Sequence, residues 1–265
     1  MSAGTSTGDI LLETRGVAKR FGGLAAVAGL ELRIGPGDLV GLIGPNGAGK
    51  TTVFNLLTGV YTPSEGQVIF AGRTVNGLKP FQVAGMGIAR TFQNIRLFPA
   101  LTALDNVRVA AHLRSRATLG GAVMRTRGLL KLDHELTERS LEYLDALNLA
   151  PSADSRAGDL AYGLQRRLEI ARALATRPRL LLLDEPAAGM NPQEKSELME
   201  LIAEIRSRFA LTVLLIEHDM KVVMGICQRI YVLDYGQVIA EGTPAEIRSN
   251  PRVIAAYLGE EAAPC

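Results

Sequence analysis

The chain has 265 residues, enough for one large domain or two small ones around a sizeable core. Hydrophobic residues make up 47% and charged residues 21%, which excludes a disordered chain and a highly charged fibre. With 29 lysine and arginine residues against 27 acidic ones, the net charge is +2, which argues against a DNA-wrapping surface and a polybasic membrane arm.

The first third of the chain predicts β-strands joined by glycine-rich turns. Residues 10–14 and 30–34 alternate apolar and polar side chains, as half-buried strands do. Residues 39–43 form a short apolar run typical of a buried parallel strand. Further short strands are expected at 67–70 and 88–91.

The middle of the chain predicts helices. From Thr102 to about Leu149, apolar residues recur at three- and four-residue steps, which is the period of an amphipathic helix. Between these helices, residues 113–130 carry four arginines and two adjacent glycines, and such a charge run is usually a solvated face. The sequence contains no apolar stretch of the roughly 18 residues that a membrane span needs.

The last third alternates strands with helices. Strands are expected at 180–183, 211–216, 230–233 and 237–240, and helices at about 193–208 and 219–228. Alternating strand and helix units imply a parallel sheet covered by helices. The helical middle is therefore best explained as an insertion into an α/β domain.

The chain ends and the two cysteines suggest no chemistry. Residues 1–8 lack the basic start and apolar stretch of a signal peptide, and both this segment and 259–265 are expected to be solvated tails. Cys227 and Cys265 can form neither a zinc cluster nor a disulfide framework, which favours a reducing compartment.

One segment carries a phosphate-binding pattern. Residues 44–51 match G-x-x-x-x-G-K-[ST] in full, after a buried strand and before a plausible helix at 51–57. Glycines let backbone amides wrap a phosphate chain, and the N-terminal amides of the helix point at it. Lys50 can then reach the β- and γ-phosphates, and the Thr51 hydroxyl can hold Mg²⁺.

A pair of carboxylates, Asp184 and Glu185, follows the apolar run at 180–183. The carboxyl tips of parallel strands are where open α/β sheets bind ligands. We expect Asp184 to hold Mg²⁺ through water and Glu185 to polarise the water that attacks the γ-phosphate. The alternative is an acidic turn that ends a core strand, and the phosphate-binding pattern in the same chain counts against it.

The order of these motifs resembles that of ABC-type ATPases. Tyr162, Gly163 and the segment 165–174 resemble the family's signature. The family order of phosphate loop, glutamine, signature, Asp-Glu pair and histidine is matched by Lys50, Gln93, Gly163, Asp184-Glu185 and His218. The resemblance covers the chain from Leu11 to Leu258.

This resemblance implies a fold and a division of the chain. The fold is α/β: a P-loop ABC-type ATPase core with an N-terminal antiparallel β subdomain and an inserted α-helical subdomain. One nucleotide-binding domain would span 9–258, with the core at about 9–95 and 160–258 and the helical subdomain at about 96–159.

The resemblance also implies roles that the residues alone do not. Phe21 matches the aromatic that stacks on adenine, Gln93 the glutamine that contacts Mg²⁺ and water, and His218 the histidine that contacts the γ-phosphate. Alone, Phe21 and His218 would be taken as core residues and Gln93 as an exposed loop glutamine. The expected catalytic residues are Glu185, His218 and Gln93, and the expected Mg²⁺ ligands are Thr51, Gln93 and Asp184. ATP is expected at Phe21, Gly44, Pro45, Asn46, Gly47, Ala48, Gly49, Lys50, Thr51, Thr52, Ala161, Tyr162 and Gly163.

In the family, the phosphate loop of one subunit faces the signature of another, with two ATP molecules between two cassettes. A helix that begins just after Gly163 could point its amides at such a phosphate. The segment departs from the common Leu-Ser-Gly-Gly-Gln at Ala161, Tyr162 and Leu164, and Ala161 lacks a hydroxyl whose hydrogen bond to phosphate is worth about 1.5–3 kcal/mol. Asn191 replaces the acidic residue that is usual after the Asp-Glu-Pro turn, yet Glu185 is present, so hydrolysis is still expected.

A narrower resemblance concerns the transporter type. Segments 87–98, 160–170, 184–189 and 241–246 resemble the larger ATP-binding cassette of bacterial branched-chain amino-acid importers, which also suits the segment 113–130. Cassettes for urea, short amides or other hydrophobic amino acids would look alike, because a cassette never touches the cargo. The resemblance implies that the partners are two transmembrane permease subunits, a second cassette (related or identical) and, indirectly, a substrate-binding protein. It also implies a peripheral location on the cytoplasmic face of the inner membrane.

Other classes of protein fit less well. A soluble ABC ATPase that acts on nucleic acid or ribosomes usually has two cassettes, a long coiled coil or basic patches, so no nucleic-acid partner is expected at net charge +2. A GTPase would need a guanine-reading Asn-Lys-x-Asp segment, which the sequence lacks, and a kinase gives no reason for the segment around Gly163. The family resemblance implies that ATP closes two cassettes and that hydrolysis at Glu185 reopens them.

Overall fold

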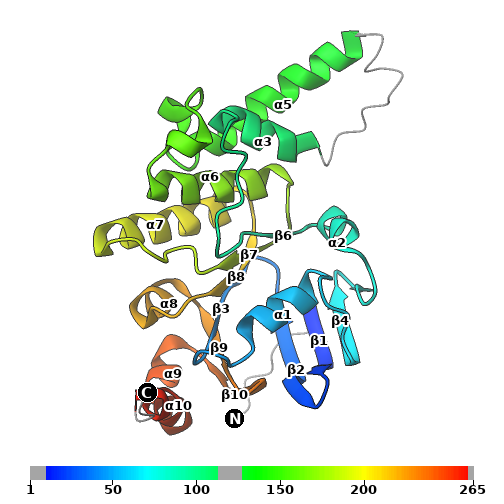
Figure 1. The fold of residues 1–265 in the computed structure, drawn as a ribbon, viewed down its shortest axis with the longest axis vertical. Coiled ribbons are helices and arrows are strands. Elements are labelled where there is room, and N and C mark those ends of the chain that lie inside the picture. The colour runs from blue at the N-terminus through cyan, green and yellow to red at the C-terminus, as the bar shows by residue number, and fades with distance from the viewer. Residues whose placement is uncertain (1–9, 113–126, 262–265) are drawn as a thin grey trace.

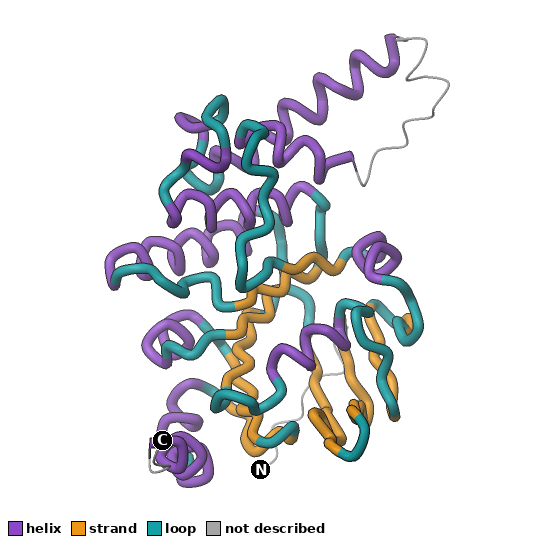
Figure 2. The backbone as a smooth tube through the Cα atoms, in the orientation of Figure 1, coloured by secondary structure: helices purple, strands orange, loops and turns teal. Residues whose placement is uncertain are grey.

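The computed structural model of the protein describes residues 10–112 and 127–261, whose arrangement is shown in Figures 1 and 2. The predictions for residues 1–8, for most of the segment 113–130 and for Cys265 lie outside the described residues. A central sheet runs through the molecule, with an antiparallel sheet beside it and a helical region at one end (Figure 1).

The N-terminal part forms a four-stranded antiparallel sheet in the order β2-β1-β4-β5. Its strands are β1 (Leu12–Phe21), β2 (Leu24–Ile34), β4 (Glu65–Phe70) and β5 (Arg73–Thr74). Strand β1 extends well beyond the predicted strand at 10–14. Gly16 has a φ of 56°, and the register with β2 shifts between Thr14 and Val17. This bulge interrupts the alternation of side chains, which is why the sequence pattern revealed only the first part of the strand.

The central sheet has six strands in the order β10-β9-β3-β8-β7-β6. They are β3 (Leu39–Ile43), β6 (Ile88–Arg90), β7 (Leu180–Asp184), β8 (Thr212–Ile216), β9 (Arg229–Asp234) and β10 (Gln237–Gly242). The pairs from β9 to β6 are parallel, and only the β10–β9 pair of this sheet is antiparallel. Strands β3, β7 and β8 are buried at every residue, so the predicted parallel sheet of buried strands is confirmed.

Helices cover both faces of the central sheet. They are α1 (Lys50–Leu57), α2 (Pro80–Met86), α7 (Pro192–Arg208), α8 (Met220–Ile226), α9 (Pro244–Ser249) and α10 (Pro251–Glu261). Alternate residues of the buried strands face two separate cores: Leu181 and Leu183 face the core with α7 and α8, and Leu180 and Leu182 the core with α1. Helix α10 extends to Glu261, so it includes the first three residues of the segment 259–265 that was expected to be a solvated tail.

The helical region contains α3 (Ala103–Ala111) and α5 (Arg127–Asp145), as the apolar periodicity from Thr102 to about Leu149 predicted, and α6 (Tyr162–Ala175). Helix α6 begins at Tyr162, with Ala161 as its N-cap, so Gly163 lies inside the first turn and the expected start after Gly163 is wrong. Ala161 offers no capping side chain, which explains why the start was not recognisable. Within the described ranges, no helix has the length and apolarity to cross a membrane.

Candidate nucleotide-binding site

The phosphate-binding pattern forms the loop between β3 and α1. Gly44, Gly47 and Gly49 have φ values of 152°, 76° and 104°. A Cβ atom at Gly44 would lie 1.9 Å from the Leu233 carbonyl oxygen, and one at Gly49 would lie 2.5 Å from the Ala26 carbonyl oxygen. Only glycine fits at these two positions, because the loop passes directly against the backbones of β2 and β9.

Lys50 begins α1 and turns back onto its own loop. Its Nζ donates hydrogen bonds to the carbonyl oxygens of Gly44 at 2.6 Å and Pro45 at 2.7 Å. Among the described residues no side chain caps the helix at Gly49, and the first amides of a helix have no partner inside it. An ammonium group beside a ring of backbone amides is the donor set that fits a polyphosphate.

A buried ion pair fixes the predicted Mg²⁺ ligand Asp184 at the end of β7. Arg90 Nη2 donates to Asp184 Oδ2 at 2.7 Å, and Arg90 Nη1 donates to Asn55 Oδ1 at 2.7 Å. The guanidinium carbon lies 5.4 Å and 5.1 Å from the ring centroids of Phe54 and Phe92. Arg90 therefore joins α1 to the carboxyl end of β7. Sequence reasoning missed this residue, which lies three positions before Gln93.

The structure brings the three predicted catalytic residues together. Gln93 Nε2 donates to Glu185 Oε2 at 3.2 Å, and His218 Nδ1 lies 3.6 Å from the same oxygen. Glu185 has a φ of 47°, a left-handed conformation that costs a non-glycine residue about 1–3 kcal/mol. The side chain of His218 is 58% exposed, so His218 is not a core histidine.

A second carboxylate, Glu217, lies beside His218 and was not predicted. Its side chain is 1% exposed, and Oε1 accepts a hydrogen bond from the Ala187 amide at 2.9 Å. Burial raises the pKa of Glu217 above its ordinary value, although the hydrogen bond from Ala187 opposes the shift. Glu217 thus holds the loop that follows Glu185 in place.

Phe21 lies at the end of β1 with 42% of its surface exposed, so it is not a core residue. Its ring meets Tyr61 edge-on, with 5.2 Å between the ring centroids, and Lys19 Nζ lies 5.3 Å from the ring centroid of Phe21. An exposed aromatic ring held by neighbours is suited to stacking on a planar ligand.

The signature residues lie apart from the phosphate loop. Helix α6, which begins with Tyr162 and Gly163, belongs to the helical region, whereas α1 lies beside the antiparallel sheet (Figure 1). A Cβ atom at Gly163 would meet only Glu194 Oε1, at 3.8 Å. The fold of this chain alone therefore does not require glycine at position 163. Asn191, where an acidic residue was expected, caps α7: its Oδ1 accepts from the Glu194 amide at 2.9 Å.

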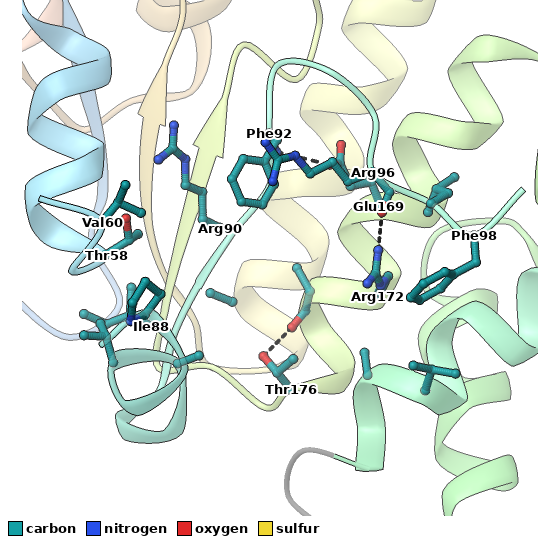
Figure 3. Close-up of a pocket in the computed structure, with 18 residues that line it drawn as sticks. Thr58, Val60, Ile88, Arg90, Phe92, Arg96, Phe98, Glu169, Arg172 and Thr176 are labelled. Atoms are coloured by element: carbon teal, nitrogen blue, oxygen red, sulfur yellow. Dashed lines mark hydrogen bonds between the residues drawn. The ribbon is translucent and has the colours of Figure 1, made fainter. Parts of the chain in front are cut away.

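A cavity of about 690 Å³ opens beside the segment that follows Gln93 (Figure 3). The Arg96 guanidinium carbon lies 4.1 Å from the ring centroid of Phe92, and that of Arg172 lies 4.7 Å from the ring centroid of Phe98. Arg172 also donates a hydrogen bond to the Arg96 carbonyl oxygen, and burial lowers its pKa. The cavity is thus lined by stacked arginine and aromatic side chains between α2, α3 and α6.

Comparison with protein-family models places this site in a known family. Residues 27–188 match the ABC transporter family, and residues 237–263 match a family described as branched-chain amino acid ATP-binding cassette transporter. The chain belongs to the ABC transporter ATP-binding proteins. It is therefore an ATPase cassette.

Curated relatives of the cassette cover nearly its whole length. It is 50% identical over 250 residues to the high-affinity branched-chain amino acid transport ATP-binding proteins LivG of Escherichia coli and BraF of Pseudomonas aeruginosa, covering 94% of this chain and 98% of each relative. It is 35% identical over 251 residues to the lipopolysaccharide export system ATP-binding protein LptB of Acidithiobacillus ferridurans, covering 95% of this chain and 98% of that protein.

Solved structures confirm the predicted fold class. The cassette is similar to an ATP-binding cassette of an ABC transporter in its ADP conformation, with a TM-score of 0.82 and 30% identity over 95% of this chain and 99% of the other. It is also similar to a bacterial ABC transporter cassette solved as a dimer, with a TM-score of 0.75 and 28% identity over 88% of this chain and 99% of the other.

Proposed function

We propose that the cassette powers the import of branched-chain amino acids. The observation that carries this proposal is the 50% identity to LivG and BraF over 94% of the chain, against 35% to LptB. The match of residues 237–263 to a family named for branched-chain amino acids supports the same cargo. We assign residues 9–258 to one nucleotide-binding domain, with a core at about 9–95 and 160–258 and an inserted helical subdomain at about 96–159. Helix α6, which directly follows the insertion, completes the helical region by packing on α3 and α5.

The nucleotide in this proposal is ATP with Mg²⁺. The loop amides and Lys50 bind the phosphates, while Thr51, Gln93 and Asp184 supply the oxygen ligands that Mg²⁺ prefers. Arg90 supports this assignment, because it bonds both Asp184 and α1, the helix that carries Thr51. The ion would neutralise charge on the β- and γ-phosphate oxygens.

Glu185 is the proposed base for hydrolysis. It would accept a proton from the water whose oxygen bonds to the γ-phosphorus, while the bond from that phosphorus to the bridging oxygen of ADP breaks. Gln93 and His218 both approach Glu185 Oε2, which orients the carboxylate and gives the γ-phosphate two neighbouring polar groups. The left-handed backbone of Glu185 is a strained geometry of the kind found at functional sites.

A second cassette, related or identical, completes each nucleotide site. The open space at Gly163 supports this step, because the signature segment of one chain can then approach a phosphate held by another. The similarity to a cassette solved as a dimer supports it as well. Ala161 has no hydroxyl to offer, so the backbone amides at the start of α6 would make the contact.

Two transmembrane permease subunits are the proposed partners, each contributing a segment to the cavity of one cassette. The cavity is lined in part by residues 96–98, which closely follow Gln93 in the chain. Because Gln93 Nε2 donates to Glu185 Oε2, a movement of this segment can be transmitted to Glu185. Its aromatic and arginine lining suits a short amphipathic helix. This docking would place the cassette peripherally on the cytoplasmic face of the inner membrane, with a substrate-binding protein acting through the permease.

The first test is the solution mass of the Glu185→Gln variant, measured by light scattering with and without ATP. We expect ATP binding, loss of hydrolysis and a shift from monomer to dimer. A variant that binds ATP but stays monomeric would require a different cassette as the partner. Unchanged steady-state hydrolysis would remove the role of Glu185, and failure of the wild-type chain to bind ATP would overturn the proposal.

The cargo needs a separate test in cells that lack the gene. Uptake of labelled leucine, isoleucine and valine should fall, and the wild-type chain but not Glu185→Gln should restore it. If uptake of urea or short amides falls while uptake of the branched-chain amino acids persists, the proposed cargo is wrong and a related importer is the answer.

A further inference from the structure

One buried arginine of α6 holds the backbone of the segment that carries Gln93. Arg166 is 3% exposed, and its Nη1 donates to the Phe92 carbonyl oxygen at 2.8 Å. Its Nη2 donates to the carbonyl oxygen of Gln93. Glu169, which is 6% exposed, accepts from the Phe92 amide at 3.1 Å and from Arg166 Nη1 at 3.3 Å. Helix α6 therefore forms hydrogen bonds with the amide of Phe92 and with the carbonyl oxygens of Phe92 and Gln93.

Tyr162 completes the contact from the start of the same helix. Its hydroxyl oxygen accepts from Arg166 Nε at 3.1 Å and from Arg166 Nη2 at 2.8 Å. Tyr162 also faces the loop after Glu185, since a Cβ atom at Gly189 would lie 3.4 Å from Tyr162 Cε1. The common signature has glycine at this position, so Tyr162 adds a side chain that the usual signature lacks.

Arg166 and Glu169 form a buried ion pair, so their charged groups need hydrogen-bond partners. A charged pair taken out of water is tolerated only where hydrogen bonds satisfy its donors and acceptors. Arg166 and Glu169 find these partners in Tyr162 and in the backbone of Phe92 and Gln93. The backbone that carries Gln93 therefore cannot move independently of the signature helix without breaking hydrogen bonds to buried ionised groups.

We infer that Arg166 and Tyr162 are positioning residues that couple the signature segment to Gln93 within one chain. The coupling extends from Gln93 to Glu185, because Gln93 Nε2 donates to Glu185 Oε2 at 3.2 Å. In the proposed pair of cassettes, this signature meets the nucleotide held by the other cassette, while Gln93 serves the nucleotide of its own. The contacts thus link the two nucleotide sites, and this last step rests on the proposed function.

The positioning role is tested by hydrogen exchange on the purified full-length chain without nucleotide. Arg166→Lys loses the planar fork that spans several partners, and Tyr162→Phe loses only the hydroxyl. Loss of a hydrogen bond to an ionised group corresponds to a factor of about 10–100, so exchange of the Phe92 amide, which donates to Glu169, should accelerate by up to that factor. The matched control is Arg167→Lys, because Arg167 neighbours Arg166 on α6 but pairs at 2.9 Å with Glu197.

The expected result is faster exchange in both test variants and wild-type exchange in Arg167→Lys. Wild-type exchange in Tyr162→Phe and Arg166→Lys would overturn the positioning role. If Arg166→Lys fails to fold, the conservative Tyr162→Phe variant still decides the question.

The coupling is tested by ATP hydrolysis in the assembled transporter. We expect the wild type and Arg167→Lys to show a Hill coefficient for ATP above 1, and Tyr162→Phe to bring it close to 1 with a lower kcat. A wild-type Hill coefficient of 1, or an unchanged coefficient in Tyr162→Phe, would overturn the coupling. If the wild-type cassette neither dimerises nor hydrolyses ATP, the proposed function is wrong. The hydrogen-exchange comparison would still test the contacts within the single chain.

Discussion

Replacement of Arg90 with methionine should lower the free energy of unfolding by about 3–5 kcal/mol. The side chains of Arg90 and Asp184 are 8% and 7% exposed, with 2.7 Å between Nη2 and Oδ2. Removal of one partner from a buried ion pair leaves an uncompensated charge, and that loss is worth about 3–5 kcal/mol. Methionine retains the apolar stem beside Phe54 and Phe92, so a cavity adds little to this figure.

The assay is urea denaturation followed by circular dichroism, because the chain contains no tryptophan. The double variant Arg90→Met with Asp184→Asn removes both charges and should recover most of the lost stability. The control is Arg167→Met, whose partly exposed pair with Glu197 should contribute no more than about 1 kcal/mol. The prediction is wrong if the free energy of unfolding of Arg90→Met lies within about 1 kcal/mol of the wild-type value. It is also wrong if the double variant is no more stable than Arg90→Met.

Three further predictions concern stability. Gly49→Ala should lower the free energy of unfolding by about 2–4 kcal/mol in urea denaturation and abolish ATP binding in calorimetry. The control is Gly72→Ala, because Gly72 has a φ of 75° and open space for a Cβ atom. This control should lose only about 1–2 kcal/mol and still bind ATP. Asn191→Ala removes the cap of α7 and should cost about 1 kcal/mol in the same denaturation. Burial raises the pKa of Glu217, so the folded chain holds this proton more tightly and stability falls as pH rises from about 4.5 through the raised pKa. Glu217→Gln should therefore raise the melting temperature more at pH 8 than at pH 4, and an equal change at both would contradict the prediction.

The buried strands could be predicted from the sequence because each is a local apolar run. Strands β3, β7 and β8 agree with the predicted runs to within one residue. Features that depend on backbone geometry were missed instead. The bulge at Gly16 concealed most of β1, and the start of α6 at Tyr162 was hidden because Ala161 gives no capping signal.

The site was predictable only where motif order carried it. Glu185, Gln93 and His218 come from separate segments, and the structure brings their side chains together, while their catalytic roles stay predictions. Arg90 had no signal of its own, because its partner Asp184 lies 94 residues away along the chain. Arg166 lies in the segment 165–174 that resembles the signature, but its role has no signal in the sequence, because its contacts with Phe92 and Gln93 exist only after folding.

The left-handed backbone of Glu185 sets stability against activity at one position. Glycine adopts a φ of 47° without the penalty that glutamate carries, so Glu185→Gly should relieve strain while it removes the proposed base. Selection of a mutant library for heat resistance alone would therefore enrich glycine at position 185, and selection for transport would remove it. Thermostable versions of this cassette should accordingly be sought by substitutions elsewhere, with residue 185 held fixed.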